Sequence, residues 1–163
     1  LMRYSVYYGS TIVPLQTDIE YINDYLLLQK MRYNRRLNYH IDIPEELMDL
    51  MIPKLLLQPV VENSLVHGMK DIRSIAINIS AWKEKGQLKL CVEDNGSGIR
   101  EEKLEELRKG LEREDVYREH IGLYNSHRVV RLLYGPESGM TIESSPGNGT
   151  KVTVTLPADM EEI

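Results

Sequence analysis

The sequence predicts an α/β two-layer sandwich, an α+β fold in which helices cover one face of a mixed, mostly antiparallel sheet. The first observation is a hairpin: two runs, 75–79 and 88–92, alternate apolar and polar residues and are joined by a short turn at 85–87. The second is the helical spacing of apolar residues before and after this hairpin. The third is the order of the predicted elements, α-β-α-β-β-α-β-β, which suits one sheet with helices packed on one side.

The first residues, 1–13, are interpreted as the end of a helix broken at Gly9, and residues 14–163 as the folded domain. The apolar side chains of this first segment have no partner of their own. We therefore expect the segment to belong to an element that lies upstream.

A first complete helix follows Pro14. Thr17 and Glu20 have the spacing of a capping box, in which the first side chain caps the helix and the second reaches back to it. Helical periodicity continues to about Arg35. Alternation over 37–43 then predicts a strand.

The central element is an apolar helix predicted from Pro59 to Gly68. Its core-facing stripe consists of Leu57, Val60, Val61, Ser64 and Leu65. Proline is tolerated near a helix start because its missing N–H has no partner to lose there. Glycine is predicted to end the helix by adopting the left-handed conformation.

Three polar side chains, Glu62, Asn63 and His67, occupy other positions of this helix. Asn63 and His67 are four residues apart and therefore lie one turn above the other. A half-buried Glu–Asn pair must find partners or a ligand. Oxygen ligands of this kind suit Mg²⁺, which is usually shared with substrate phosphates. The structural alternative is that Glu62 caps a neighbouring loop and His67 covers a helix end.

The second half begins with a charge-rich stretch, 100–119, that contains a short helix at 101–110. This helix lacks a strong apolar face, so we expect the stretch to be mobile. A helix over 122–134 is stopped by a Gly-Pro pair. Strands over 140–144 and 150–156 complete the predicted sheet.

Glycine-rich loops follow the central helix. In the first, Asp94-x-Gly96-x-Gly98, a carboxylate at the sheet edge can accept from an exocyclic amine, and glycines let a flat base approach the backbone. The second, 121–123, begins a helix whose free N–H groups can meet phosphate. The third, 147–150, is by itself best interpreted as a hairpin turn.

The amino-acid composition limits the classes of protein to which the chain can belong. The 163 residues are 42% hydrophobic and 28% charged, as in ordinary globular domains. The net charge of −5 argues against a nucleic-acid-binding protein, because such proteins carry a basic field. The single cysteine excludes a disulfide framework and fits a reducing compartment. No apolar segment approaches the roughly 20 residues needed to cross a bilayer.

Four motifs in a fixed order carry a resemblance to a known family. They are Glu-Asn-x-x-x-His-Gly at 62–68, Asp-x-Gly-x-Gly at 94–98, Gly-Leu-x-Asn at 122–125 and Gly-x-Gly-Thr at 147–150. Together they resemble the nucleotide site of the GHKL superfamily, which has the Bergerat ATPase fold. Within it the sequence most resembles the LytS/YesM-like sensor histidine kinases, whose Gln-Pro-x-x-Glu-Asn string stands at 58–63.

The resemblance implies the ATP-binding catalytic domain of a two-component sensor histidine kinase, with ATP and Mg²⁺ bound. Residues 1–13 would then be the tail of the upstream dimerisation helix or its linker. Asn63 resembles the Mg²⁺ ligand, and Glu62 resembles the carboxylate that acts through a metal-bound water. Residues 100–120 correspond to the lid over the nucleotide.

The positions that the resemblance assigns to nucleotide binding are Asn63, His67, Asp94, Gly96, Gly98, Ile99, Gly122, Leu123 and Thr150. Asp94 would read the adenine amine, and Thr150 would support the water network beside it. His67 would face phosphate, where Gly122 and Leu123 would touch the triphosphate.

Two positions depart from the family pattern. His120 stands where the second loop usually has another glycine, which puts phosphate contacts by the lid in doubt. Val129 stands where the next helix usually carries arginine, which changes how that helix docks. None of the four histidines has a phosphoacceptor setting, so the acceptor is expected outside these residues.

The implied partners are the upstream dimerisation and phosphoacceptor domain of the same protein, a response regulator and a second copy in a homodimer. Nucleic acid is not among them. The domain would be cytoplasmic, in a parent protein anchored in the plasma membrane. Two alternatives remain. An anti-sigma-type serine kinase shares the fold, but the region 14–32 resembles the sensor-kinase linker instead. A non-catalytic nucleotide-binding docking module is favoured by His120.

Overall fold

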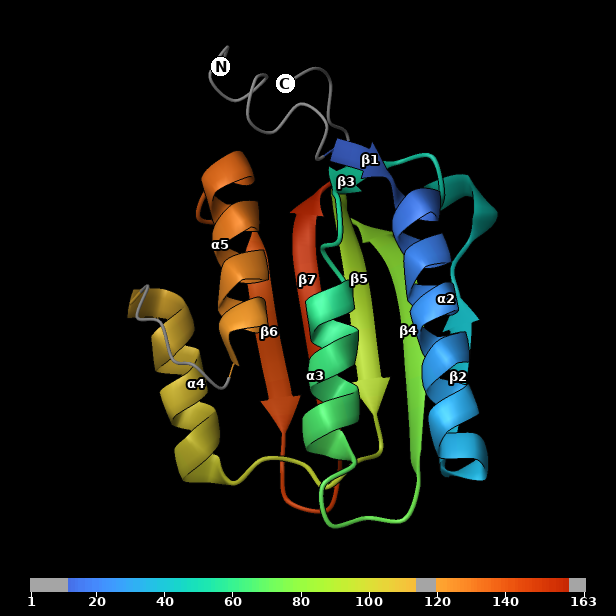
Figure 1. The fold of residues 1–163 in the computed structure, drawn as a ribbon. Helices are drawn as coiled ribbons and strands as arrows, with labels where there is room; N and C mark the ends of the chain where they lie inside the picture. Colours follow the sequence, from blue (N-terminus) through green and yellow to red (C-terminus); the bar gives the residue numbers. More distant parts are fainter. Residues whose placement is uncertain (1–11, 114–119, 159–163) are drawn as a thin grey trace.

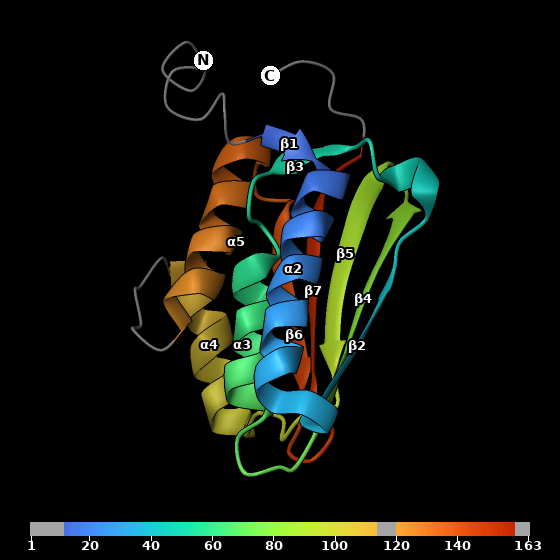
Figure 2. The same cartoon turned by 45° about the vertical axis from the view of Figure 1, so that its right-hand side comes forward.

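The computed structural model describes residues 12–113 and 120–158 of the 163-residue chain. There, a five-stranded sheet is covered on one face by helices (Figures 1 and 2). The strands of the sheet are β2 (Leu37–Asp42), β4 (Ile75–Glu84), β5 (Gln87–Asp94), β6 (Gly139–Ser144) and β7 (Thr150–Pro157). The helices are α2 (Leu15–Tyr33), α3 (Gln58–Gly68), α4 (Glu101–Arg113) and α5 (Ile121–Tyr134). The predicted two-layer α/β sandwich is confirmed.

The sheet is mixed and mostly antiparallel, as predicted. Its strand order is β2-β4-β5-β7-β6. Strand β2 runs parallel to β4, whereas the other neighbouring pairs are antiparallel. In β5, Leu88, Leu90 and Val92 are fully buried, whereas Glu93 is exposed. Alternation therefore turns one apolar face of the sheet toward the helices (Figure 2). In the described part of the chain, no helix combines the length and apolar character needed to cross a bilayer.

Two short strands beside the sheet were not predicted. Strands β1 (Ile12–Pro14) and β3 (Met51–Pro53) pair antiparallel across one end of the sandwich (Figure 1). The predicted helix break at Gly9 lies outside the described residues.

The start of α2 also differs from the prediction. The helix begins at Leu15, and no side chain caps it. Instead, the N–H groups of Leu15 and Gln16 donate to the carbonyls of Leu50 (2.8 Å) and Met48 (3.0 Å). Thr17 lies inside the first turn, so the predicted capping box is wrong. The pairing of β1 with β3 brings in main-chain acceptors that a local sequence pattern does not reveal.

A buried carboxylate joins α2 to the turn that precedes α3. Asp18 is 1% exposed, and its oxygens accept the N–H groups of Leu55 (2.5 Å) and Leu57 (3.2 Å). Burial raises the pKa of this carboxyl, and the N–H donors oppose the rise. Leu55 has φ 59°, a left-handed conformation that costs energy in a residue with a side chain. Asp18 thus holds the strained turn from which the central helix starts.

The helix α3 closely matches the predicted 59–68. Its buried residues are Val60, Val61, Ser64, Leu65 and Gly68. Gly68, however, is not left-handed, and the chain continues into Met69 at φ −79° and ψ −8°. The reason for glycine is space: a Cβ there would lie 2.6 Å from Cδ1 of Ile75 and 3.2 Å from Oδ1 of Asp94.

The helix α4 has the apolar face that the sequence analysis did not expect, and it continues past Gly110 to Arg113. The buried leucines of this face are Leu104, Leu107 and Leu111. Nε of Arg108 donates to the carbonyl of Ile142 in the edge strand β6 at 3.1 Å. The helix is therefore docked on the sheet. The remainder of the stretch predicted to be mobile, 114–119, lies outside the described residues.

Candidate functional site

Two glycine-rich loops meet at the end of α3, at one end of the strands of the sheet (Figure 1). The N–H of Ser97 donates to the carbonyl of Gly68 at 3.0 Å, and its carbonyl accepts the N–H of Gly147 at 2.8 Å. The hydroxyl of Ser97 also donates to the carbonyl of His67 at 3.2 Å. The loop after β5 thus connects the end of the central helix to the turn between β6 and β7.

Asp94 is the last residue of β5 and lies at this junction. It is 4% exposed and is paired in register with Thr150 of β7. Oδ1 accepts the N–H of Gly96 at 2.9 Å, whereas Oδ2 is buried without a hydrogen-bond partner among the described residues. Burial raises the pKa of Asp94, while the N–H of Gly96, the hydroxyl of Ser64 and the main chain of Thr150 pull it down. One carboxylate oxygen therefore remains to accept a donor from a ligand.

The glycines of these loops permit close contact between backbones. A Cβ on Gly96 would lie 2.5 Å from the carbonyl oxygen of Gly68. Gly98 has φ 77°, and a Cβ there would lie 2.0 Å from the carbonyl oxygen of Ser145. These two glycines therefore pack the loop against α3 and against the β6–β7 turn.

Ser144 organises the β6–β7 side of the junction. Its hydroxyl donates to the carbonyl of Gly149 at 2.7 Å and lies 3.0 Å from Oγ1 of Thr150. The same oxygen accepts the N–H of Ile99 at 2.9 Å. The predicted residues Ile99 and Thr150 are thus linked through a serine that the sequence analysis did not select.

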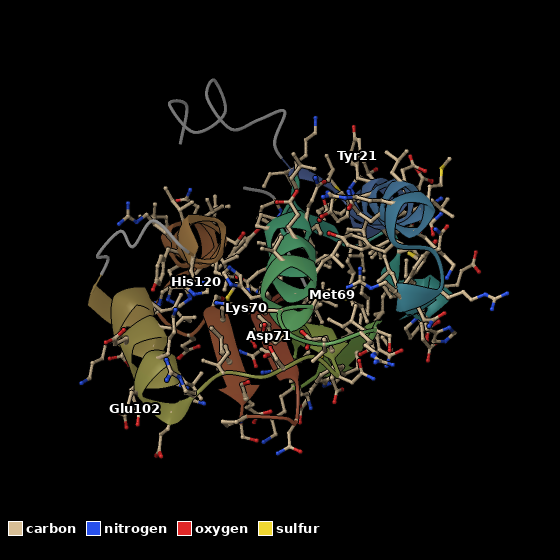
Figure 3. All side chains as sticks on the ribbon, turned by 60° about the horizontal axis from the view of Figure 1, so that its bottom comes forward. Tyr21, Met69, Lys70, Asp71, Glu102 and His120 are labelled. Carbon is tan, nitrogen blue, oxygen red and sulfur yellow. The ribbon has the colours of Figure 1, made fainter. Side chains whose placement is uncertain are left out.

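The polar residues of α3 line a separate cleft of about 210 Å³ between α3 and the start of α5. Nδ1 of His120 lies 2.9 Å from Oδ1 of Asn63. The rings of His120 and His67 pack with centroids 4.7 Å apart and planes at 39°. Figure 3 shows His120 between α4 and the end of α3 that Met69 and Lys70 mark. His120, which departs from the family pattern, therefore contacts Asn63, the predicted metal ligand.

Three other predicted residues also line this cleft. Oε1 of Glu62 accepts a hydrogen bond from Nε2 of Gln58 at 3.1 Å, one turn earlier in the same helix, so it does not cap a neighbouring loop through this bond. Gly122 packs against α3, since a Cβ there would lie 2.8 Å from Cβ of Pro59. The side chain of Leu123 is 2% exposed and belongs to the core, so any ligand contact must come from its main chain.

The structure thus places the predicted residues in two neighbouring groups. The cleft of α3 and α5 holds Glu62, Asn63, His67, Gly122 and Leu123. Asp94 and Thr150 line a hollow of about 430 Å³ where β5 and β6 end and β7 begins. The hydrogen bond from Ser97 to His67 joins the two groups.

Sequence reasoning did not select three serines of the site: Ser64, whose hydroxyl lowers the pKa of Asp94, Ser97 and Ser144. A serine inside the apolar stripe of α3 is a signal, because a buried hydroxyl needs a partner.

Comparisons with known proteins place this geometry in a family. Residues 48–160 match the family described as histidine kinase-, DNA gyrase B-, and HSP90-like ATPase, and residues 1–37 match the histidine kinase family. The sensor histidine kinase YesM of Bacillus subtilis (strain 168) is 32% identical over 164 residues, which cover 100% of this chain and 27% of YesM. The sensor protein kinase HptS of Staphylococcus aureus (strain USA300) is 31% identical over 157 residues, or 96% of this chain and 30% of HptS. The chain thus spans less than a third of the length of these relatives.

Solved structures share the fold. The catalytic domain of histidine kinase ThkA has a TM-score of 0.64 and 14% identity, covering 93% of this chain and 98% of that one. The histidine kinase domain of a blue-light activated histidine kinase from Erythrobacter litoralis has a TM-score of 0.60 and 18% identity, covering 89% of this chain and 61% of that one. The chain therefore belongs to the histidine kinase-, DNA gyrase B- and HSP90-like ATPases, as an ATPase domain of the histidine kinase type.

Proposed function

We propose that this domain binds ATP with Mg²⁺ and transfers the γ-phosphoryl group to a histidine outside these 163 residues, on the dimerisation domain of the same sensor kinase. The observation that carries the proposal is the buried, unpartnered Oδ2 of Asp94 beside a glycine-rich loop packed against α3. A carboxylate oxygen in that position selects a ligand that brings an amine donor, as adenine does.

The adenine end would lie at the junction of the loops. Asp94 would accept the exocyclic amine, and Gly96, Gly98 and Ile99 would surround the base. Thr150 would hold the adjacent water network through the hydroxyl contact with Ser144. The covered position of Oδ2 means that the base must displace the atoms that now bury it.

The phosphate end would lie in the cleft between α3 and α5. Asn63 would offer its amide oxygen to the metal, His67 would face phosphate, and the N–H groups of Gly122 and Leu123 at the start of α5 would meet the triphosphate. No three His, Cys, Asp or Glu side chains in 12–113 and 120–158 gather as a metal site. An ion held through Asn63 would therefore need phosphate and water oxygens as its other ligands, as Mg²⁺ commonly does.

Glu62 would act as the carboxylate that positions or deprotonates the acceptor through a water on the metal, because it lies in the same cleft next to Asn63. Bound Mg²⁺ would neutralise the charge that develops on the transferred phosphoryl group. The rest of the domain contributes mainly by holding the nucleotide in position.

The partners that we propose follow from this reaction. An upstream dimerisation domain would supply the acceptor histidine in a homodimer, with residues 1–13 as the link to it. A response regulator would take the phosphoryl group next. We also propose that the parent protein is anchored in the plasma membrane with this domain in the cytoplasm, because the relatives are sensor kinases.

Radiolabelled ATP tests the proposal. The 163-residue chain should bind ATP without labelling itself, because none of its histidines has the setting of a phosphoacceptor. His40 lies in strand β2, His67 in α3, His127 in α5, and His120 directly before α5. A separate polypeptide with the upstream dimerisation helices should become labelled when it is added, and an Asn63→Ala variant should not label it. Acid-labile label on any histidine of this chain contradicts the proposal.

A second candidate is a nucleotide-binding docking module without transfer activity. The contact of His120 with Asn63 favours it, because it engages the oxygen that the metal needs. The same experiment separates the two functions, since a docking module binds ATP but leaves the added partner unlabelled.

A further inference from the structure

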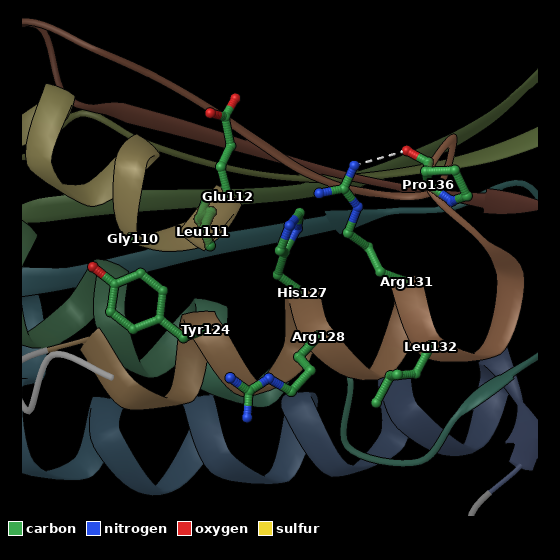
Figure 4. Close-up of a pocket in the computed structure, with 9 residues that line it drawn as sticks. All are labelled: Gly110, Leu111, Glu112, Tyr124, His127, Arg128, Arg131, Leu132 and Pro136. Carbon is green, nitrogen blue, oxygen red and sulfur yellow. Dashed lines mark hydrogen bonds between the residues drawn. The ribbon is translucent and has the colours of Figure 1, made fainter. Parts of the chain in front are cut away.

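A hollow between the end of α4 and one face of α5 has no role in the proposed function (Figure 4). Its volume is about 360 Å³, which falls in the range of roughly 300–1,000 Å³ typical of small-molecule sites. The lining residues differ completely from those of the cleft that holds Asn63. Binding there is therefore separable from nucleotide binding.

A buried histidine beside this hollow carries an unused donor. His127 is 8% exposed, and its Nδ1 accepts the N–H of Met140 at 3.0 Å. The neutral ring therefore carries its proton on Nε2. Burial, together with the charge of Arg131, lowers the pKa of His127 and keeps the ring neutral. Nε2 is buried without a hydrogen-bond partner among the described residues, an arrangement that proteins rarely leave uncompensated.

Arg131 is the cation beside the imidazole of His127. Figure 4 shows the ring extending between Glu112 and Arg131, whereas the guanidinium of Arg128 points away from it. A carboxylate on the ligand would pair with the guanidinium of Arg131, whereas the carboxylate of Glu112 disfavours further negative charge. Nη2 of Arg131 donates to the carbonyl of Pro136 at 3.0 Å, which orients the guanidinium beside the imidazole.

The remaining walls are largely apolar. Leu111 and the ring of Tyr124 line one end of the hollow, and Leu132 and Pro136 line the other. An apolar body on the ligand would cover these surfaces, and burying them is favourable.

We propose that this hollow binds a small organic monocarboxylate, with the carboxylate between Nε2–H of His127 and the guanidinium of Arg131 and the apolar body against Leu111 and Tyr124. Paired N–H donors from an imidazole and a guanidinium match the two oxygens of a carboxylate. Because Nε2 is covered, the carboxylate enters by displacing a neighbouring side chain. Glu112 lines the hollow and is exposed, so its side chain is free to move aside.

Benzoate and its neutral analogue benzamide are suitable probes for the 163-residue chain without nucleotide. Benzoate should shift the ring Cε1–H resonance of His127 in NMR spectra and show saturable binding by calorimetry. Benzamide, which fills the same volume without the charge, should bind at least about tenfold more weakly, as expected for one lost charged hydrogen bond. This comparison needs no substitution, so it tests the proposal on the unmodified fold.

Substitutions locate the site. Arg131→Gln should weaken benzoate about tenfold, whereas Arg35→Gln, the same change at an exposed residue after α2, should leave binding unchanged. His127→Gln offers both an acceptor for Met140 and a donor into the hollow, and should retain most of the binding that His127→Leu loses. Equal binding of the two probes, no shift at His127 with millimolar benzoate, or full binding by Arg131→Gln would each overturn the proposal.

Discussion

Nδ1 of His120 lies 2.9 Å from Oδ1 of Asn63, so the residue before α5 contacts the side chain that we propose as the magnesium ligand. The ring of His67 packs against the same imidazole. His120 thus contacts both of the other side chains inside the cleft. A metal that approaches Asn63 must compete with His120 for the amide oxygen.

Replacing this histidine by the glycine that the family pattern has there should therefore tighten Mg²⁺–ATP binding. The competing hydrogen bond contributes about 0.5–1.5 kcal/mol, which corresponds to a gain of up to about tenfold for His120→Gly. Calorimetry with a non-hydrolysable ATP analogue measures the change. The same titration in EDTA is the control and should show a smaller difference. Weaker binding with Mg²⁺ would instead mean that His120 positions Asn63 for the metal.

Asp94 should decide which base the domain accepts. ATP and ADP should bind, and GTP should not, because guanine lacks an amine donor at the corresponding edge. Asp94→Asn places an amide donor where the base needs an acceptor. The substitution should weaken ATP binding by about 1–3 kcal/mol. Equal affinities for ATP and GTP, measured by calorimetry, would exclude this role for Asp94.

The same substitution should make the domain more stable. Burial raises the pKa of Asp94 above its ordinary 3.8, so the folded domain binds this proton more tightly than the unfolded chain does. Stability from this group is therefore lost as the pH rises through the raised pKa, and the charged form opposes folding at neutral pH. In urea, Asp94→Asn should unfold at a higher concentration than the parent at neutral pH. The advantage should shrink as the pH falls toward about 4. A difference that does not change with pH would contradict this explanation.

Gly96→Ala should damage both stability and nucleotide binding. The added Cβ would lie 2.5 Å from the backbone of Gly68, so the loop must move away from α3. Overpacking of this kind costs about 1–3 kcal/mol in the free energy of unfolding. Gly147→Ala is the control: a Cβ there meets nothing within 4 Å, and its cost comes only from φ 78°. Thermal melts should detect both losses, but ATP affinity should fall only for Gly96→Ala.

Glu62→Gln should separate binding from transfer. Glutamine keeps the shape of the side chain and still accepts the hydrogen bond from Gln58, so Mg²⁺–ATP should bind normally. Autophosphorylation of the full-length kinase should fall at least about a hundredfold if the carboxylate acts in proton transfer. Glu46→Gln, the same change at an exposed position outside the cleft, should have no effect. A normal rate for Glu62→Gln would remove the carboxylate from the mechanism.

The sequence by itself determined the order of the main elements, the buried face of the sheet and the bounds of the central helix to within one residue. These features follow from periodicity, which is a local property: Leu88, Leu90 and Val92 point to the same side wherever the strand is placed. The motifs around Asn63 and Asp94 also carried the family, because their order and spacing are read along the chain.

Only the tertiary structure decided how these pieces contact one another. The main-chain carbonyls of Met48 and Leu50 replace the cap expected from Thr17. Packing against β6 and α5 buries the leucines of α4, whose apolar face is hard to recognise in the sequence among its charged neighbours. The contact between Asn63 and His120 joins residues 57 positions apart. Such distances depend on how helices and strands pack, and packing is set by side chains from several elements at once.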